Sequence, residues 1–252
     1  MTRWNRRIAR ADDLEARYPA AAELLRFYRT IARFQRDLAL DLEEVEELPA
    51  DLSLHPARLP WRLPHYRRRL LQLVQQEGPE KLAKAARSLL RTEDWDPADP
   101  APRFIARVLM QPYAETVAMR ARPSGFAAGM EAVRTVCPFC GEKPVTAVLR
   151  PEGEGGKRRL LCSLCATEWE FRRLLCPSCG EEDHRKLPVY VAEEFPHVRV
   201  EACDTCRVYL KAIDMTKDGL AAPEVDELAA VPLDLWAAGR GYGKLQANLL
   251  GL

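Results

Sequence analysis

The 252-residue sequence lacks the features that mark several large classes of protein. Its formal net charge is only +1, so composition gives no reason to expect a nucleic acid, a membrane surface or an acidic partner. No apolar run approaches the roughly 18 residues of a membrane-spanning helix. Near the start, Arg6-Arg7 is followed by the acidic residues Asp12, Asp13 and Glu15 instead of an apolar stretch, which argues against a secretory or twin-arginine signal. These absences predict a cytoplasmic protein without membrane insertion.

Recognisable catalytic motifs are also missing. The sequence shows no nucleophile–histidine–acid set, no glycine-rich phosphate-binding loop and no helix with the pattern His-Glu-x-x-His. We therefore predict no catalytic residues and no organic cofactor site, and we expect a protein that is not an enzyme.

Cysteine is absent from the first 136 residues, and no cysteine in the chain stands alone. All eight occur as Cys-x-x-Cys pairs, which are Cys137/Cys140, Cys162/Cys165, Cys176/Cys179 and Cys203/Cys206. In the reducing cytoplasm such pairs are more often metal ligands or redox dithiols than disulfides. A thioredoxin-like dithiol is disfavoured, because proteins of that kind carry one pair on a βαβ unit and not four pairs in tandem.

The four pairs belong to an internal repeat. Segments beginning at Cys137 and Cys176, 39 residues apart, both open with Cys-Pro-x-Cys-Gly-Glu. Each then offers a strand, a turn, a second strand, another Cys-x-x-Cys pair and a last strand with an aromatic residue. Proline and glycine accompany only the first and third pairs, so the order of pair types along the chain is A, B, A, B.

This spacing predicts two metal ions, each held by four thiolates. Two tight turns can surround one ion tetrahedrally, and a two-residue gap lets both sulfurs of a turn face it. Gly141 and Gly180 allow the backbone conformation that must follow the second sulfur. The repeat favours one site made of Cys137, Cys140, Cys162 and Cys165, and a second made of Cys176, Cys179, Cys203 and Cys206.

Two alternatives stay open at this point. In a cross-braced arrangement the first pair would join the third and the second would join the fourth. Alternatively, both ions would do no more than stabilise β units too small to bury a core, a role in which zinc supplies about 10–16 kcal/mol of apparent binding energy.

Other polar residues give weaker signals. His184 and His197 lie inside the second repeat, but four thiolates already complete a metal shell, so we interpret both as ordinary surface or turn histidines. The run Tyr66-Arg67-Arg68-Arg69 is typical of a solvated helix face. The region 137–211 carries twelve basic and twelve acidic residues, without the basic stripe of a nucleic-acid-binding ribbon. Four tryptophans are interpreted as packing residues: Trp61, Trp95, Trp169 and Trp236.

The hydrophobic pattern divides the chain into a helical half and a β-rich half. Apolar residues at helical spacing predict a helix from roughly Ala20 to Glu47, and further helices over 65–76, 79–91 and 103–122, with the last interrupted at Pro112. Proline-rich breaks are expected at 50–64 and 95–102. Short strands are predicted at 145–149, 188–192 and 198–202, and two short helices in 232–252, split by a turn at Gly239–Gly243.

We therefore predict an α+β fold in which a helical N-terminal domain precedes two tandem small β units and short C-terminal helices. The expected boundaries are 1–130 for the helical domain, 131–174 for the first metal-binding unit, and 175–252 for the second unit with the C-terminal helices.

Tandem Cys-Pro-x-Cys-Gly units after a helical half resemble the formate dehydrogenase accessory protein family. The resemblance is carried by RADDLEARYPAAAELLRFYRTIARFQ near the start, by CPFCGEKPVTAVL and LLCSLCATEWEFRRLLCPSCG in the cysteine block, and by LDLWAAGRGYGKLQANLLGL at the end. It covers nearly the whole chain and is most specific over 137–252. The middle of the helical half is short for this family.

The resemblance implies a cytoplasmic maturation factor, or chaperone, that binds the catalytic subunit of a respiratory formate dehydrogenase before export. It also implies rubredoxin-like or zinc-ribbon units that hold iron or zinc, which a tetrahedral shell of four sulfurs suits equally. Of the tail residues, Trp236, Tyr242 and Asn248 are candidates for mutation, although packing explains them more simply. The competing hypotheses are a zinc-ribbon module that binds nucleic acid and a small iron–thiolate redox protein.

Overall fold

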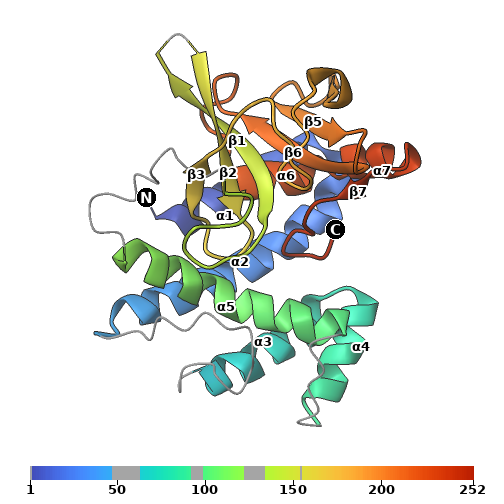
Figure 1. Ribbon diagram of the computed structural model, residues 1–252. Helices are drawn as coiled ribbons and strands as arrows, with labels where there is room; N and C mark the ends of the chain where they lie inside the picture. Colours follow the sequence, from blue (N-terminus) through green and yellow to red (C-terminus); the bar gives the residue numbers. More distant parts are fainter. Residues whose placement is uncertain (1, 47–62, 92–98, 122–133, 154) are drawn as a thin grey trace.

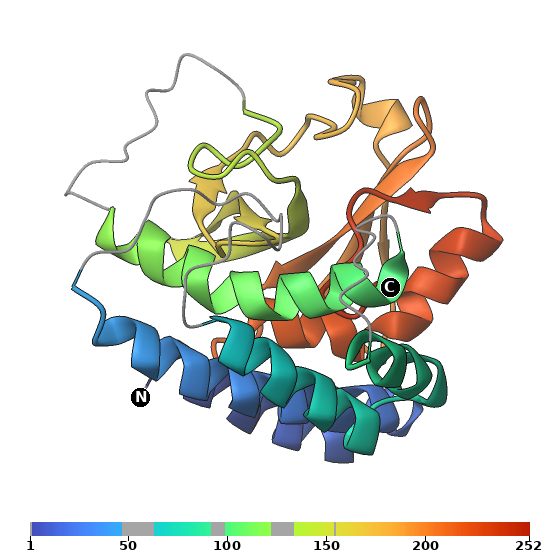
Figure 2. The same ribbon diagram turned by 90° about the horizontal axis from the view of Figure 1, so that it is seen from below.

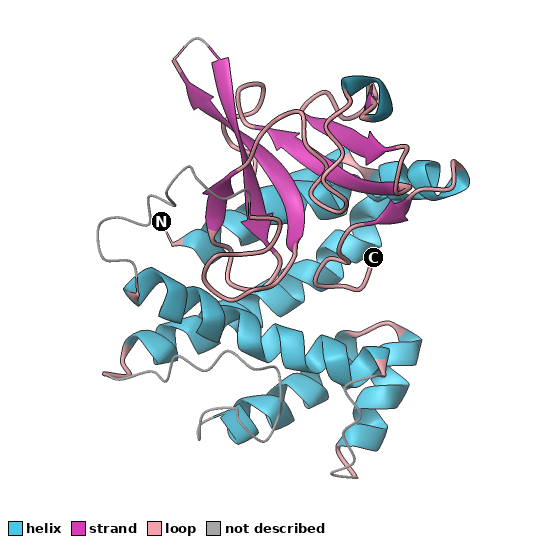
Figure 3. Ribbon diagram, viewed as in Figure 1, coloured by secondary structure: helices cyan, strands magenta, loops and turns pink. Residues whose placement is uncertain are grey.

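The computed structural model describes residues 2–46, 63–91, 99–121, 134–153 and 155–252. Trp61 and Trp95 lie outside these ranges, as do residues 50–62 of the first predicted proline-rich break and 95–98 of the second. The rest of the second predicted break is wrong from residue 100 onward, because a helix begins at Pro100. Helices make up the described part of the first half and strands most of the cysteine-rich half, and helices of the first half lie on both sides of the strands (Figures 1 and 3). This arrangement confirms the predicted α+β class. Within the ranges described, no helix is both long and apolar enough to cross a membrane.

The chain begins with an antiparallel pair of helices. α1 (Arg3–Arg17) is capped by the Thr2 hydroxyl, which accepts a hydrogen bond from the Asn5 N–H. A short 3-10 turn (Pro19–Ala21) leads into α2 (Ala22–Glu43). The apolar stripe predicted for this helix is buried as expected, although the helix is shorter at both ends than the predicted span.

Three more helices complete the helical half. α3 (Leu63–Glu77) and α4 (Glu80–Leu89) are separated at Gly78-Pro79, where the sequence predicts a break. α5 (Pro100–Arg120) follows and packs against α2, α3 and α4. Figure 2 shows α5 crossing between the strands and the other helices of this half.

The predicted interruption of α5 at Pro112 is wrong, because the helix runs through this proline without a break. Proline has no N–H to donate to the carbonyl four residues earlier, which here belongs to Val108. The side-chain amide of Gln35, on α2, donates to that carbonyl at 3.0 Å. A partner distant in the sequence thus satisfies the carbonyl that the proline leaves without a helical donor.

The second half forms one mixed sheet. Its strands are β1 (Pro144–Glu152), β2 (Gly155–Cys162), β3 (Glu168–Glu170), β4 (Val189–Val191), β5 (Val198–Cys203), β6 (Val208–Asp214) and β7 (Gly243–Lys244), with a 3-10 turn at His184–Lys186 before β4. The order is β3-β2-β1-β6-β5-β4, with β7 beside β6. Each repeat supplies three antiparallel strands, and parallel pairing of β1 with β6 joins the two repeats.

Two helices follow the sheet, and the predicted tail is partly wrong. α6 (Pro223–Ala229) contacts α1, α2, β1 and β6, so it lies between the helical hairpin and the sheet. α7 (Val231–Gly239) ends at the predicted glycine turn. No helix follows that turn, because the backbone of Gly243 and Leu245 donates to the carbonyls of Arg207 and Tyr209 and forms β7.

Both faces of the central strand β1 are buried. Val145 and Val148 pack toward α6 and the α1–α2 pair, whereas Ala147 and Leu149 belong to the core shared with α5. A register irregularity between Pro144 and Thr146 interrupts the alternation of side chains, so Val145 shares a face with Val148, while Ala147 and Leu149 lie on the opposite face. Consequently the sheet is enclosed between two helical layers at its first repeat, and this position determines the environment of the first cysteine cluster.

Candidate metal centres

The structure brings the cysteines together in two groups of four, each drawn from one repeat. In the first group the sulfurs of Cys137 and Cys165 are 3.5 Å apart, and those of Cys140 and Cys162 are 3.3 Å apart. In the second group the corresponding distances, Cys176 to Cys206 and Cys179 to Cys203, are both 3.7 Å. These contacts join the two Cys-x-x-Cys turns of one repeat, as the repeat pattern favours, and differ from those of a cross-brace.

The geometry fits a tetrahedral ion in each group. All four sulfurs of a group lie within 4.8 Å of one another. Sulfurs placed about 2.3 Å from a central ion are about 3.8 Å apart along the edges of the tetrahedron, close to the distances in the second group. Four thiolates with no competing oxygen ligand are the donor set of zinc and of rubredoxin-type iron. Both clusters could therefore hold a metal ion.

The backbone of the four turns follows the repeat closely. After the first pair of each repeat, Gly141 and Gly180 adopt the same left-handed φ of +78°. After the second pair, Ala166 and Arg207 also have positive φ, at 50° and 57°. The left-handed residue turns the chain back around the sulfurs, and the N–H groups of Phe139 and Ser178 point at Cys137 and Cys176 at 3.4 Å in both repeats.

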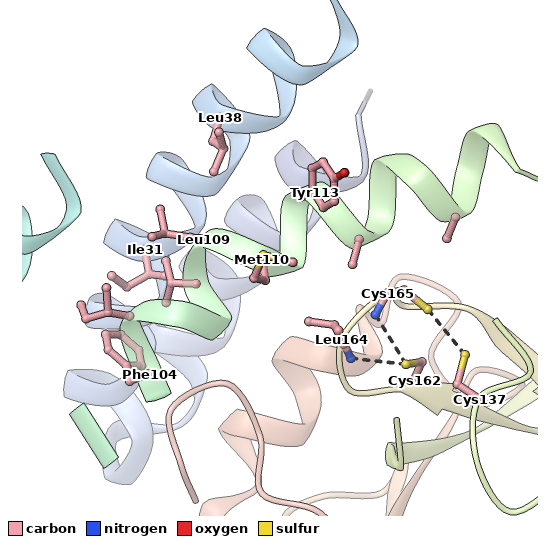
Figure 4. Close-up of a cluster of buried hydrophobic side chains, with 14 of the residues drawn as sticks. Ile31, Leu38, Phe104, Leu109, Met110, Tyr113, Cys137, Cys162, Leu164 and Cys165 are labelled. Atoms are coloured by element: carbon pink, nitrogen blue, oxygen red, sulfur yellow. Dashed lines mark hydrogen bonds between the residues drawn. The ribbon is translucent and has the colours of Figure 1, made fainter. Parts of the chain in front are cut away.

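The first cluster is built into the main core. Cys137, Cys162 and Cys165 are buried and belong to the hydrophobic cluster that includes α5. In Figure 4 these cysteines lie beside α5, with Leu164 between Cys162 and the helix. The buried Arg107 of α5 donates to the Ser163 carbonyl at 3.1 Å, which ties the helix to the second turn of this cluster.

The second cluster lies nearer the surface. Cys179 is exposed and Cys206 is half-buried, while Cys176 and Cys203 are covered. Its turns are linked by a solvent-exposed hydrogen bond, in which the Thr205 hydroxyl donates to Glu181 at 2.5 Å. Among the described residues, no helix of the first half covers the second cluster as α5 covers the first.

Crowding of the thiols perturbs their protonation. In the first cluster, hydrogen bonds among the four thiols lower the pKa of Cys137 and raise that of Cys162, so the group shares its protons unequally. In the second, burial raises the pKa of Cys176 to about 12. Binding of an ion requires thiolates and therefore releases these protons.

The interpretation of His197 as a surface or turn histidine is wrong, whereas His184 is exposed as predicted. His197 is buried, and its Nε2 lies 2.7 Å from Asp226 of α6. Asp226 and Asp218 also bind Arg10 of α1, at 2.5 Å each. A buried guanidinium therefore occupies this acidic cluster, which holds α1, α6 and the sheet together.

The tail residues pack as the simpler interpretation expects. Trp236 and Tyr242 both lie against Tyr190 of β4, with ring centroids 4.7 and 6.5 Å apart. Asn248 is buried and donates to Glu227 at 2.9 Å. Glu227 in turn pairs with the fully buried Lys211 at 2.9 Å. Sequence reasoning missed this buried ion pair, because neither residue belongs to a local motif.

Comparison with known proteins matches the region that contains both clusters. Residues 136–173 match the family described as "FdhE, central domain", and residues 174–250 match "FdhE, C-terminal domain". The first segment contains all four cysteines of the first cluster, and the second contains those of the second cluster.

Individual relatives agree with this match. The chain is 38% identical over 119 residues to a "Protein FdhE homolog" of Aquifex aeolicus and 38% identical over 122 residues to one of Pseudomonas aeruginosa. These alignments cover 47% and 46% of this chain but only 42% and 40% of the relatives. The structural similarity covers more of the chain than these alignments do. The crystal structure of the FdhE protein from Pseudomonas aeruginosa aligns with 99% of this chain and 96% of the crystallised chain, with a TM-score of 0.73 and 26% sequence identity.

Proposed function

Because this chain belongs to the FdhE family, we propose that it is a metal-binding accessory protein for the maturation of a respiratory formate dehydrogenase. It acts by binding the catalytic subunit of that enzyme and does not itself catalyse a reaction. Each cluster of four cysteines holds one ion, and the eight cysteines are the ligands.

One observation carries this proposal. Both FdhE segments contain a complete cluster of four cysteines, and the likeness to a solved FdhE structure extends through the helical half as well. The cysteine clusters alone would fit many zinc ribbons. Their combination with the same helices in the same fold favours the accessory role.

The bound ions are iron or zinc. Zinc would make both units rigid supports for partner recognition, whereas iron would add the capacity for one-electron chemistry. Anaerobic purification followed by metal analysis distinguishes them. We expect two ions per chain, and a folded, reduced protein without bound metal would contradict the proposal.

The accessory role is tested by complementation. A bacterial host deleted for its own FdhE gene receives this chain, and its respiratory formate dehydrogenase activity is measured. We expect activity to return with the wild-type chain and to remain low with a variant in which Cys176 and Cys179 are serine. The catalytic subunit should co-purify with the wild-type chain. Failure of both restoration and co-purification, with the chain expressed and folded, would contradict the role.

A further inference from the structure

β4 forms one edge of the sheet. β4 ends the strand order, and among the described strands none pairs with its outer edge. β4 and β1 are equivalent in the repeat, since each is the first strand after the Cys-Pro-x-Cys-Gly turn and each pairs with the strand leading to the second cysteine pair. In the first repeat the outer edge of β1 is occupied by β6 in parallel register. In the second repeat, no strand of the described residues occupies the equivalent edge of β4.

Apolar side chains stand beside this open edge. Val189 and Val191 are 54% and 73% exposed, and they lie on one face of β4 because they are two residues apart. Leu174, in the segment that connects the two repeats, is 57% exposed. Exposed apolar residues gathered at an open strand are typical of an interaction surface rather than of a solvated edge.

A groove lies on one face of the sheet next to this strand, over β5 and β6. Its volume is about 210 Å³, and Leu174, Leu187 and Val189 line it together with Leu245 of the tail. Cys176 and Cys203 also line it, so the groove adjoins the second cluster. An apolar side chain that enters here would lie against the turns that hold the second ion.

The polar lining of the groove carries an excess of positive charge. Arg158, Arg173 and Arg199 line it, with Glu201 the one carboxylate among the lining residues described. Glu201 pairs with both Arg158 and Arg199, at 2.7 and 2.8 Å. Arg173 is exposed and donates to the main-chain carbonyl of Gly156. The lining is therefore complementary to an acidic ligand that also presents apolar groups.

We propose that the outer edge of β4 and the adjoining groove bind an extended segment of the client formate dehydrogenase catalytic subunit, in which apolar residues alternate with acidic ones. This inference rests on the proposed function for the identity of the client. The chemistry of the segment is inferred from the groove alone. We define the groove by Leu174, Leu187, Val189, Arg173 and Glu201. We call it the β4 groove.

Strand addition is the binding mode that this surface fits. The Pro188 carbonyl accepts a hydrogen bond from Ala202 of β5, so by alternation the peptide groups of Val189 and Val191 are directed to the outer side. A segment paired there gains main-chain hydrogen bonds, while alternate side chains lie on the face that Val189 shares with the groove. The parallel pairing of β6 with β1 provides the precedent within the same chain.

The first test uses peptides and the full-length, metal-loaded protein. Blocked, fluorescent nonapeptides of alternating valine and glutamate, and of alternating valine and lysine, are compared by anisotropy at low salt. We expect the glutamate peptide to bind about tenfold more tightly than the lysine peptide, a difference of about 1.4 kcal/mol. Equal affinities, or no binding of the glutamate peptide, would overturn the proposal.

Surface variants localise the binding. Val189→Asp and Arg173→Glu should each weaken binding of the glutamate peptide about tenfold, because both place a negative charge at the groove. Leu235→Asp is the matched control, since Leu235 is 72% exposed on α7 and does not line the groove. All three positions are exposed, so the variants retain the fold, which circular dichroism checks. An equal loss in all three variants would contradict the assignment to this groove.

A final arm separates the two proposals. The purified catalytic subunit is bound to the wild-type chain, and the glutamate peptide and Val189→Asp are tested for interference. Loss of client binding in both cases supports the β4 groove. If neither the glutamate peptide nor Val189→Asp affects client binding, the β4 groove is not the client site, and the accessory role is unaffected. Peptide binding as expected, with no client binding to the wild type, contradicts the accessory role and leaves the groove as a peptide site.

Discussion

The two cysteine clusters share their local structure and differ in their surroundings. Both are formed by the same pair of turns, with the same φ of +78° at Gly141 and Gly180. The first cluster is continuous with the core beneath α5, whereas the second leaves Cys179 exposed and adjoins the β4 groove.

This difference separates what a sequence repeat determines from what tertiary packing determines. A Cys-x-x-Cys turn fixes the positions of its own sulfurs, and the repeat fixes which turns meet. Burial depends on elements from elsewhere in the chain, here α5 and Arg107. We infer that the first cluster mainly supports the fold, while the second is the cluster that a partner or a reagent can reach.

The largest predicted effect comes from removing one equivalent ligand in each cluster. Cys162→Ser and Cys203→Ser should each release one ion, and binding of a structural ion supplies about 10–16 kcal/mol, comparable with the ~5–15 kcal/mol stability of a domain. Cys162 belongs to the core shared with α5, so its replacement should abolish cooperative thermal unfolding. Cys203→Ser should leave a cooperative transition of the helical half, followed by circular dichroism. Equal losses in the two variants would refute the difference between the clusters.

Metal removal should also distinguish the clusters. With a chelator present, the second cluster should lose its ion about tenfold faster, because a chelator reaches exposed Cys179 more readily than the buried first group. Metal analysis over time gives the rates, and mass mapping of alkylated cysteines assigns them. Cys179 and Cys206 should be modified before Cys137, Cys162 and Cys165. The reverse order would show that exposure does not govern release.

A smaller effect is expected from the contacts around the clusters. Arg107→Ala removes the buried hydrogen bond to the Ser163 carbonyl and should lower the free energy of unfolding by about 1–3 kcal/mol. Thr205→Ala removes an exposed hydrogen bond at the second cluster and should change the free energy of unfolding by about 0.5 kcal/mol or less. Denaturant unfolding of the metal-loaded proteins measures both. If Thr205→Ala cost as much as Arg107→Ala, the second cluster would be as tightly supported as the first.

The smallest difference between the clusters is expected at the two glycines that follow their first cysteine pairs. Gly141→Ala and Gly180→Ala place a Cβ where no atom lies within 4 Å, so the cost is that of a left-handed alanine alone, about 1–2 kcal/mol. Because both glycines have the same φ, the two losses should agree within about 0.5 kcal/mol in chemical denaturation. Unequal losses would indicate that the surroundings of each cluster also alter the conformation of its turns.

Much of this architecture follows from local patterns. The 39-residue repeat predicts which cysteines meet, and the helical periodicity around Ile31 and Leu38 predicts the buried face of α2. Turns and amphipathic helices are recognisable because the residues that define them are close in sequence.

Features that depend on distant partners were missed or wrongly predicted. Pro112 does not break α5 because Gln35 serves the carbonyl of Val108. His197 is buried because Asp226 and α6 cover it, and the tail forms β7 because β6 offers it an edge. The parallel pairing of β1 and β6 likewise has no signature in either strand.

Native mass spectrometry of the reduced, metal-loaded chain in which Cys162 and Cys165 are both serine tests the assignment most directly. If each ion is held within one repeat, this variant keeps one ion because the second repeat retains all four of its ligands, and Cys176, Cys179, Cys203 and Cys206 resist alkylation. Loss of both ions from protein whose second repeat remains folded, or a retained ion that protects Cys137 together with Cys176, would contradict the account.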